Sequence, residues 1–164
     1  ENAATALKVV EVLKENFPFT ELQIAEGLKN TKWPARFEMI EKEPLVIRDG
    51  AHNENAALRL KESLQKYFTK PQFIYIMGVL KDKEYEKIID IMAPMTELVY
   101  VIAPKNERAL PAEELRAAWE KHNKKVIVAK DAKEALKLAL HVYGEESGIL
   151  CFGSLSFMSE LTSA

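Results

Sequence analysis

Two side chains able to do chemistry follow one short apolar stretch of the sequence. Leu45–Ile47 predicts a strand, Asp49 and His52 come directly after it, and an amphipathic helical pattern starts at Asn53. A carboxylate, an imidazole and a helix N-terminus therefore meet at the carboxyl end of a strand, where open α/β sheets usually bind ligands. A carboxylate suits ribose hydroxyls because it accepts two hydrogen bonds. An imidazole can donate a hydrogen bond to a carboxylate or to a developing phosphate charge.

Each of these residues also has a purely structural explanation. Asp49-Gly50 is a common turn sequence, and on spacing alone we favour the turn. Asn53 is expected to be the N-cap of the following helix, and His52 could cap or precede that helix. The pattern by itself therefore leaves the roles of Asp49 and His52 open.

Arg36 and Ser154 are further candidates for binding. By default Arg36 is a solvated cation, but its guanidinium could clamp a nucleotide, because it donates in a fork and stacks on flat rings. Ser154 follows Gly153 at the start of a short predicted helix, where it could cap the helix, bind a carboxylate, or do both. Asp82 and Lys83 follow another predicted strand, either as a solvated loop or as an interdomain contact.

These candidates are positioned by an alternation of strands and helices that starts near residue 37. Residues 1–32 are predicted to be helical, with an interruption at Phe17-Pro18 and an N-cap at Thr20. The nearly continuous apolar strand cores and the βαβ order predict a mostly parallel sheet with helices on both faces. Strands are predicted at residues 37–41, 45–48, 73–77, 98–102, 126–129 and 149–152, and helices at 53–68, 85–92, 111–122, 131–143 and 154–161.

Composition limits the class of protein. The chain has 164 residues, enough for one domain with a sizeable core, and its 48% hydrophobic and 29% charged residues indicate a globular protein. A net charge of −2 gives no electrostatic case for nucleic-acid binding, and no apolar stretch is long enough to span a bilayer. The single cysteine, Cys151, fits a reducing compartment, so we expect a cytoplasmic protein with neither a nucleic-acid nor a membrane partner.

Several short motifs occur in the order typical of one enzyme family. Together they resemble the folylpolyglutamate synthase/dihydrofolate synthase family, which belongs to the wider group of Mur-type amide ligases. Each motif alone is weak, whereas the ordered set extends over nearly the whole chain and is a strong signal. The motifs are Trp33-Pro-Ala-Arg-Phe-Glu38, Asp49-Gly-Ala-His-Asn53, Gly78-Val-Leu-Lys-Asp-Lys83, Arg108-Ala-Leu-Pro111 and Gly153-Ser-Leu155.

The resemblance implies a Rossmann-like three-layer α/β sandwich of the Mur-ligase C-terminal-domain type over residues 33–164. Residues 1–32 would then be a helical tail and linker of a preceding ATPase domain. The chain starts at Glu1 rather than Met and lacks the family's G-x-x-x-x-G-K-[ST] phosphate loop. Only Gly148 and Gly153 have nearly that spacing, and Ser154 follows them where a lysine is needed. We therefore expect a fragment that is inactive alone, with the phosphate loop and the magnesium site in the missing domain.

The family to which this resemblance points adds L-glutamate to folate with ATP and Mg²⁺. ATP phosphorylates the terminal carboxylate of the folate and the glutamate amino group attacks the acyl phosphate; some members also attach the first glutamate to dihydropteroate. By resemblance, Arg36 and Asp49 contact the nucleotide, His52 and Ser154 bind glutamate, and His52 also serves catalysis, with no metal ligand in this chain. The expected partners are ATP, L-glutamate, a folate or dihydropteroate and the preceding domain of the same chain, in a monomer.

Two departures from the family pattern and two rival functions follow from the same residues. Arg48 stands where the family often has an apolar residue, so Arg48 would add a charge beside the site. Ser156 stands where an aromatic residue is common.

The main alternative function is a non-catalytic nucleotide-binding or interaction module on the same fold. A hydrolase using Asp49 and His52 lacks a convincing nucleophile, because no G-x-S-x-G elbow is present.

Overall fold

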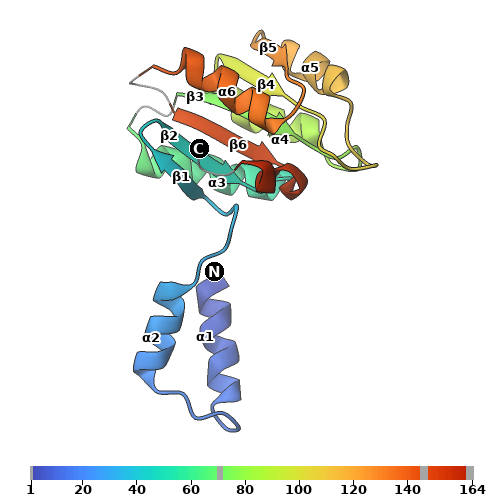
Figure 1. Ribbon diagram of the computed structural model, residues 1–164. Helices are drawn as coiled ribbons and strands as arrows, with labels where there is room; N and C mark the ends of the chain where they lie inside the picture. Colours follow the sequence, from blue (N-terminus) through green and yellow to red (C-terminus); the bar gives the residue numbers. More distant parts are fainter. Residues whose placement is uncertain (1, 70–71, 145–147, 162–164) are drawn as a thin grey trace. The chain divides into compact units, whose positions relative to one another are not determined.

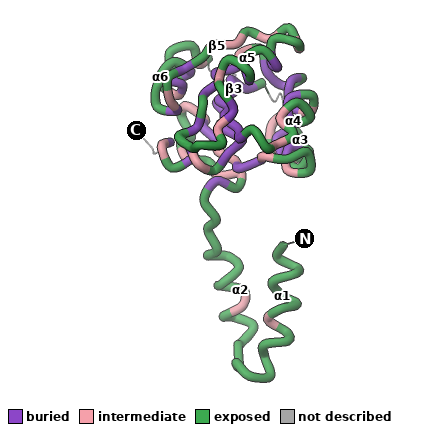
Figure 2. Tube along the Cα trace, turned by 90° about the vertical axis from the view of Figure 1, so that its right-hand side faces the viewer, coloured by how far each residue is buried: buried purple, intermediate pink, exposed green. Residues whose placement is uncertain are grey.

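The computed structural model describes residues 2–69, 72–144 and 148–161, and the chain divides into two compact units, Glu1–Pro34 and Ala35–Ala164. The first unit consists of α1 (Asn2–Leu13) and α2 (Glu21–Asn30). The predicted cap at Thr20 is confirmed, because its hydroxyl accepts a hydrogen bond from Gln23 N at 3.2 Å and the Gln23 side chain accepts one from Thr20 N at 2.9 Å. None of the described residues of α1 and α2 is buried (Figure 2), so these two helices have no core of their own.

The second unit is an α/β sandwich built on one six-stranded sheet (Figure 1). The strand order is β1-β2-β6-β3-β4-β5. The β1–β2 pair is antiparallel and the other four pairs are parallel, which confirms the predicted mostly parallel sheet. The strands are β1 (Glu38–Lys42), β2 (Leu45–Asp49), β3 (Phe73–Gly78), β4 (Leu98–Val101), β5 (Lys125–Val128) and β6 (Gly148–Gly153).

Helices cover both faces of this sheet, as predicted. Buried side chains of α3, α4 and α5 form one core with the sheet, and those of α6 and η2 form a second core on the opposite face. Figure 1 shows α6 and α3 separated by the sheet. The helices are α3 (Glu54–Tyr67), α4 (Tyr85–Met92), α5 (Ala112–Glu120) and α6 (Ala132–Val142), with two 3₁₀ helices, η1 (Ala93–Met95) and η2 (Leu155–Glu160).

Local chemistry explains where the helices begin. Asn53 Oδ1 accepts a hydrogen bond from Ala56 N at 2.9 Å and Asp131 Oδ1 accepts one from Glu134 N at 2.9 Å, so both are N-caps. The last predicted helix is a 3₁₀ helix, η2, rather than an α-helix. Its sequence is short and rich in serine, whose hydroxyls compete with the backbone for hydrogen bonds.

Successive residues of β2 point to opposite faces of the sheet. Val46 belongs to the core under α6 and η2, whereas Ile47 belongs to the core under α3, α4 and α5. The same alternation places Arg48 on the η2 face and Asp49 on the α3 face. Although Arg48 and Asp49 are adjacent in the sequence, their side chains therefore lie on opposite faces of the sheet.

Candidate functional site

A pocket of about 170 Å³ lies at the carboxyl ends of β2, β6 and β3. Its volume is below the roughly 300–1,000 Å³ of sites for drug-sized ligands, so its size suits a small molecule or one end of a larger ligand. The residues that line it come from three loops: His52 after β2, Leu80 and Lys83 after β3, and Ser154 and Leu155 after β6.

The strand order explains why a pocket forms at this edge. β6 lies between β2 and β3, although it follows both in the sequence. The chain leaves β2 and β3 toward α3 and α4 on one face, and leaves β6 toward η2 on the other face. Chains that diverge from neighbouring parallel strands leave a crevice, which is the usual ligand position in open α/β sheets.

His52 is half-buried at this edge and is oriented by its own loop. Its Nδ1 lies 2.7 Å from the carbonyl oxygen of Gly50. Because a carbonyl can only accept a hydrogen bond, Nδ1 carries a proton, and Nε2 of the neutral ring has a free lone pair. The donor role expected for His52 therefore requires the doubly protonated ring, whereas the neutral ring offers an acceptor.

Ser154 is buried, and the structure places it as the N-cap of η2. Its N–H donates to Gly78 O at 2.7 Å, and its hydroxyl accepts from Ser156 N at 3.2 Å and shares a hydrogen bond with Ser156 Oγ at 2.7 Å. The backbone amides of Ser154 and Ser156 are both bonded already, and the 3₁₀ helix is too short to add a helix-terminus site. The hydroxyl is therefore the group that Ser154 can offer to a ligand.

Lys83 is a pocket residue to which the sequence assigned no binding role, although it predicted that Lys83 follows a strand on the cleft side of the sheet. Its Nζ lies 3.1 Å from Asp82 Oδ2, and Arg108 Nη1 lies 3.5 Å from the same oxygen. Sequence reasoning expected a solvated loop or an interdomain contact here. The available signal was its position shortly after β3, but the pairing of β3 with β6, which brings Lys83 to Ser154, is not encoded in local sequence.

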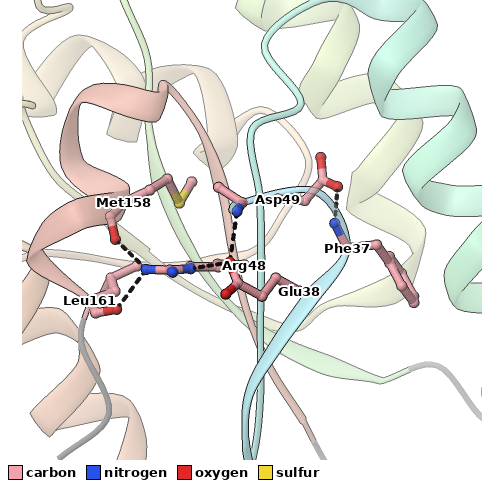
Figure 3. A network of polar contacts seen from close by, with 7 residues as sticks. Phe37, Glu38, Arg48, Asp49, Met158 and Leu161 are labelled. Atoms are coloured by element: carbon pink, nitrogen blue, oxygen red, sulfur yellow. Dashed lines mark hydrogen bonds and ion pairs between the residues drawn. The ribbon is translucent and has the colours of Figure 1, made fainter. Parts of the chain in front are cut away.

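A strained loop at Ala35–Phe37 lies against Asp49 (Figure 3) and places the charge of Arg36 near the Asp49 carboxyl. Asp49 Oδ2 accepts a hydrogen bond from Phe37 N at 2.7 Å, and Gly50 N donates to Ala35 O at 2.8 Å. Ala35 and Phe37 have φ angles of 54° and 46°, which are uncommon for residues other than glycine. Such conformations persist only where the surroundings enforce them, and they cluster at functional sites. Arg36, between them, is exposed.

The environment of Asp49 disfavours its charge. Burial raises the pKa of the Asp49 carboxyl, and the hydrogen bond from Phe37 N and the nearby charge of Arg36 oppose this rise only in part. A carboxyl whose pKa is perturbed by burial and by a specific charge partner is a candidate for a functional role. A ligand that donates hydrogen bonds to the Asp49 carboxylate would stabilise its charged form, which burial disfavours.

Arg48, which we expected to add a charge beside the site, is paired and points away from Asp49. Its Nε donates to Glu38 Oε2 at 2.8 Å, so the guanidinium is neutralised on the face of the sheet opposite Asp49 (Figure 3). The alternation of side chains along β2 accounts for this separation.

Neither a metal cluster nor a membrane span occurs in the described part of the chain. Within residues 2–69, 72–144 and 148–161, no three or more His, Cys, Asp or Glu side chains are grouped to hold a metal ion. None of the helices in these ranges is long and apolar enough to cross a bilayer.

Comparison with known proteins identifies the family. Residues 35–155 match the family model described as "Mur ligase, glutamate ligase domain". This chain belongs to that family. The match of the glutamate ligase domain starts at the first residue of the second unit and covers β1 to the start of η2.

Relatives of the glutamate ligase domain carry consistent names. Two are dihydrofolate synthase/folylpolyglutamate synthases, from Bacillus subtilis (29% identical over 163 residues) and from Buchnera aphidicola subsp. Acyrthosiphon pisum (32% over 162 residues). The alignments cover 98% and 99% of this chain but only 37% and 38% of those relatives. The chain therefore spans little more than a third of their length.

Solved structures share the fold of the domain. E. coli FolC in complex with DHPP and ADP superposes with a TM-score of 0.86 at 23% identity, over 97% of this chain and 37% of that one. Mycobacterium tuberculosis folylpolyglutamate synthase complexed with ADP gives a TM-score of 0.79 at 23% identity, over 87% and 34%. These likenesses confirm the predicted α/β architecture.

Proposed function

We propose that this chain is the glutamate ligase domain of an ATP-dependent enzyme that adds L-glutamate to a folate, as a folylpolyglutamate synthase, a dihydrofolate synthase or both. The names of the relatives support this activity for a longer protein, since the chain spans only 37–38% of their length. ATP would phosphorylate the terminal carboxylate of the folate, and the glutamate amino group would then displace phosphate from the acyl phosphate. The observation that carries the proposal is the pocket shared by His52, Lys83 and Ser154.

This pocket suits the amino-acid substrate. Glutamate brings two carboxylates and one amino group, and the pocket offers the Lys83 ammonium, the Ser154 hydroxyl and the His52 imidazole. The amine must lose its proton as it attacks the acyl phosphate. Because Nδ1 of His52 is bonded to Gly50 O, Nε2 of the neutral ring can accept that proton. His52 therefore has a proposed role as a proton acceptor as well as a binding residue.

We assign the nucleotide contact to Arg36 and Asp49. The exposed guanidinium of Arg36 can donate in a fork or stack on the base. Asp49 can accept hydrogen bonds from ribose hydroxyls, which would offset the burial that raises its pKa. The strained loop between Ala35 and Phe37 would hold both groups in place before ATP binds.

Magnesium and the ATP phosphates do not fit the described part of this chain, which has no acidic cluster for the metal and no phosphate loop. We propose that a preceding domain supplies both, that residues 1–32 are its helical tail, and that residues 33–164 form the ligase domain. The lack of buried residues in α1 and α2 supports their packing on such a domain. Closure of the two domains would exclude water, which otherwise hydrolyses the acyl phosphate. We propose a cytoplasmic monomer.

Ligase activity of the full-length protein tests the function. With ATP, magnesium, glutamate and either tetrahydrofolate or dihydropteroate, wild type should form product, and Arg36→Ala should lower kcat/KM for ATP about 10–100-fold through the loss of a charged contact. Arg116→Ala is the matched control, because Arg116 is exposed on α5 and pairs with Glu120 of the same helix. Absence of product with both folates would refute the ligase function.

Lys83→Met should raise KM for glutamate about 10–100-fold and leave KM for ATP nearly unchanged, because the variant loses a cation in the small pocket. Lys87→Met is the control: Lys87 is exposed on α4, pairs with Glu84 and Glu54, and does not line the pocket. Steady-state kinetics with each substrate varied in turn makes the measurement. An equal rise in KM for ATP would show that Lys83 does not act on glutamate.

A further inference from the structure

The guanidinium of Arg48 joins two segments that are far apart in the sequence (Figure 3). Its Nε donates to Glu38 Oε2 at 2.8 Å, and its Nη1 donates to the carbonyl oxygens of Met158 and Leu161, each at 2.9 Å. These carbonyls lie at the end of η2, where Met158 O also accepts a hydrogen bond from Leu161 N at 3.2 Å and Leu161 is the C-cap residue. With 16% of its side chain exposed, Arg48 is held in one geometry by these contacts.

Glu38 extends the connection into the Ala35–Phe37 loop. Its Oε2 also accepts a hydrogen bond from Ala35 N at 2.7 Å. The hydrogen bond from Arg48, followed by the one from Ala35, lowers the pKa of Glu38, so this carboxylate stays charged. A continuous set of polar contacts therefore runs from the strained loop through Glu38 and Arg48 to the end of η2.

The two joined segments carry the proposed binding residues. Arg36 is the exposed residue of the loop, and Ser154 and Leu155 start η2. The segments also pack closely, because a Cβ added at Gly50 would overlap the Leu155 side chain, and Gly50 N is bonded to Ala35 O. A shift of either segment would therefore displace both the nucleotide contact and the small pocket.

We propose that Arg48 is a positioning residue that holds the Arg36 loop and η2 as one unit, so that the nucleotide and glutamate contacts are set together. This inference rests on the ligase function proposed above. Arg48 lies on the face of the sheet opposite Asp49 and does not line the pocket, so it acts through Arg36 and Ser154 rather than by touching a substrate. An apolar side chain could fill its space but could not bind Glu38 and two carbonyls at once.

Arg48→Met in the full-length protein provides the test. Amide hydrogen exchange should become about tenfold faster in both residues 35–38 and residues 155–161. KM for ATP and KM for glutamate should each rise about tenfold, while kcat at saturating substrates changes little, because the reacting groups themselves are intact. Arg116→Met, on α5, is the matched control and should change none of these values.

Two further variants separate positioning from folding. Arg48→Lys keeps the charge but not the fork, so it should restore part of the lost protection and part of each KM. Glu38→Met combined with Arg48→Met leaves no unpaired buried charge, so its unfolding temperature should return toward that of wild type. Its two KM values should stay raised, because Ala35 N no longer bonds Glu38 and the two carbonyls at the end of η2 no longer bond Arg48.

Three results would overturn the proposal. Wild-type exchange in both segments of Arg48→Met, or a lower unfolding temperature with neither KM changed, would reduce Arg48 to a residue of the fold. A rise in KM for one substrate alone would contradict joint positioning. If wild type forms no product, the ligase function fails separately, and the exchange rates still decide whether Arg48 joins the two segments.

Discussion

Replacing Asp49 with asparagine is expected to leave the fold intact and to lower kcat/KM for ATP about 10–100-fold. The amide oxygen of asparagine can still accept the hydrogen bond that Phe37 N donates to Asp49 Oδ2 at 2.7 Å, so the Ala35–Phe37 loop keeps its anchor. What the variant loses is the second carboxylate oxygen, with its negative charge, that would accept hydrogen bonds from the ribose. Activity should therefore fall without a matching loss of structure.

Stability should move in the opposite direction from activity. Burial raises the pKa of Asp49, so the folded state binds this proton more tightly than the unfolded chain does. The stabilising effect of the protonated carboxyl is complete at low pH and is lost as the pH rises through the raised pKa. Asp49→Asn avoids the buried charge, so its melting temperature should equal or exceed that of wild type at neutral pH, and the difference should shrink toward acid pH.

Thermal unfolding over a pH series and steady-state kinetics make the two measurements on Asp49→Asn. Asp90→Asn is the matched control, because Asp90 is exposed on α4, pairs with His122 at 3.2 Å and lies outside the candidate site. Wild-type kcat/KM in Asp49→Asn would show that Asp49 is only a loop anchor. Unfolding of the variant at neutral pH would show that the fold needs the charge.

Gly153→Ala is expected to destabilise the ligase domain by about 3 kcal/mol or more. Gly153 has a φ of 119°, and a Cβ at this position would overlap the carbonyl oxygen of Gly78. The strands cannot separate freely to make room, because Ser154 N donates to the same oxygen at 2.7 Å. Backbone conformation and close approach therefore both require glycine at the end of β6.

Thermal unfolding measures this effect, and a drop of about 6–12 °C corresponds to it for a chain of this size. Gly27→Ala is the matched control: a Cβ at Gly27 meets nothing within 4 Å, and alanine favours the α2 helix by about 0.5–1 kcal/mol. A Gly153→Ala variant as stable as wild type would mean that the ends of β3 and β6 can relax, and that the pocket beside them is not rigid.

Much of the fold follows from local patterns in the sequence. The apolar runs at β3 and β6 predict strands buried on both faces, and every residue of both strands is buried. Short polar residues before helical patterns predict the caps at Thr20 and Asn53, and both accept the expected backbone hydrogen bond. These features depend on a few neighbouring residues, so the sequence is enough to predict them.

The candidate site depends on long-range pairing that local patterns do not reveal. Motif order places Asp49, His52 and Ser154 after strands, but only the insertion of β6 between β2 and β3 brings His52 and Ser154 to one pocket with Lys83. The contacts of Arg48 with Met158 and Leu161 cross more than 100 residues of chain, and the sequence predicted only that Arg48 adds a charge beside the site. The binding roles of Arg36, Asp49, His52 and Ser154 stay predictions until the variants are assayed.

The central position of β6 also determines when the sheet can form during synthesis of the chain. This strand pairs with both β2 and β3, yet it is synthesised after the other five. Until β6 has been synthesised, the edges of β2 and β3 that pair with it would stay unpaired in the nascent chain. These apolar edges could then pair with the wrong strands. Folding should be slow because its central pairings are distant in sequence. A chain whose translation stops before β6 would lack the central strand of the sheet. We therefore expect such a truncated chain to be degraded by proteases rather than to form a partly folded domain.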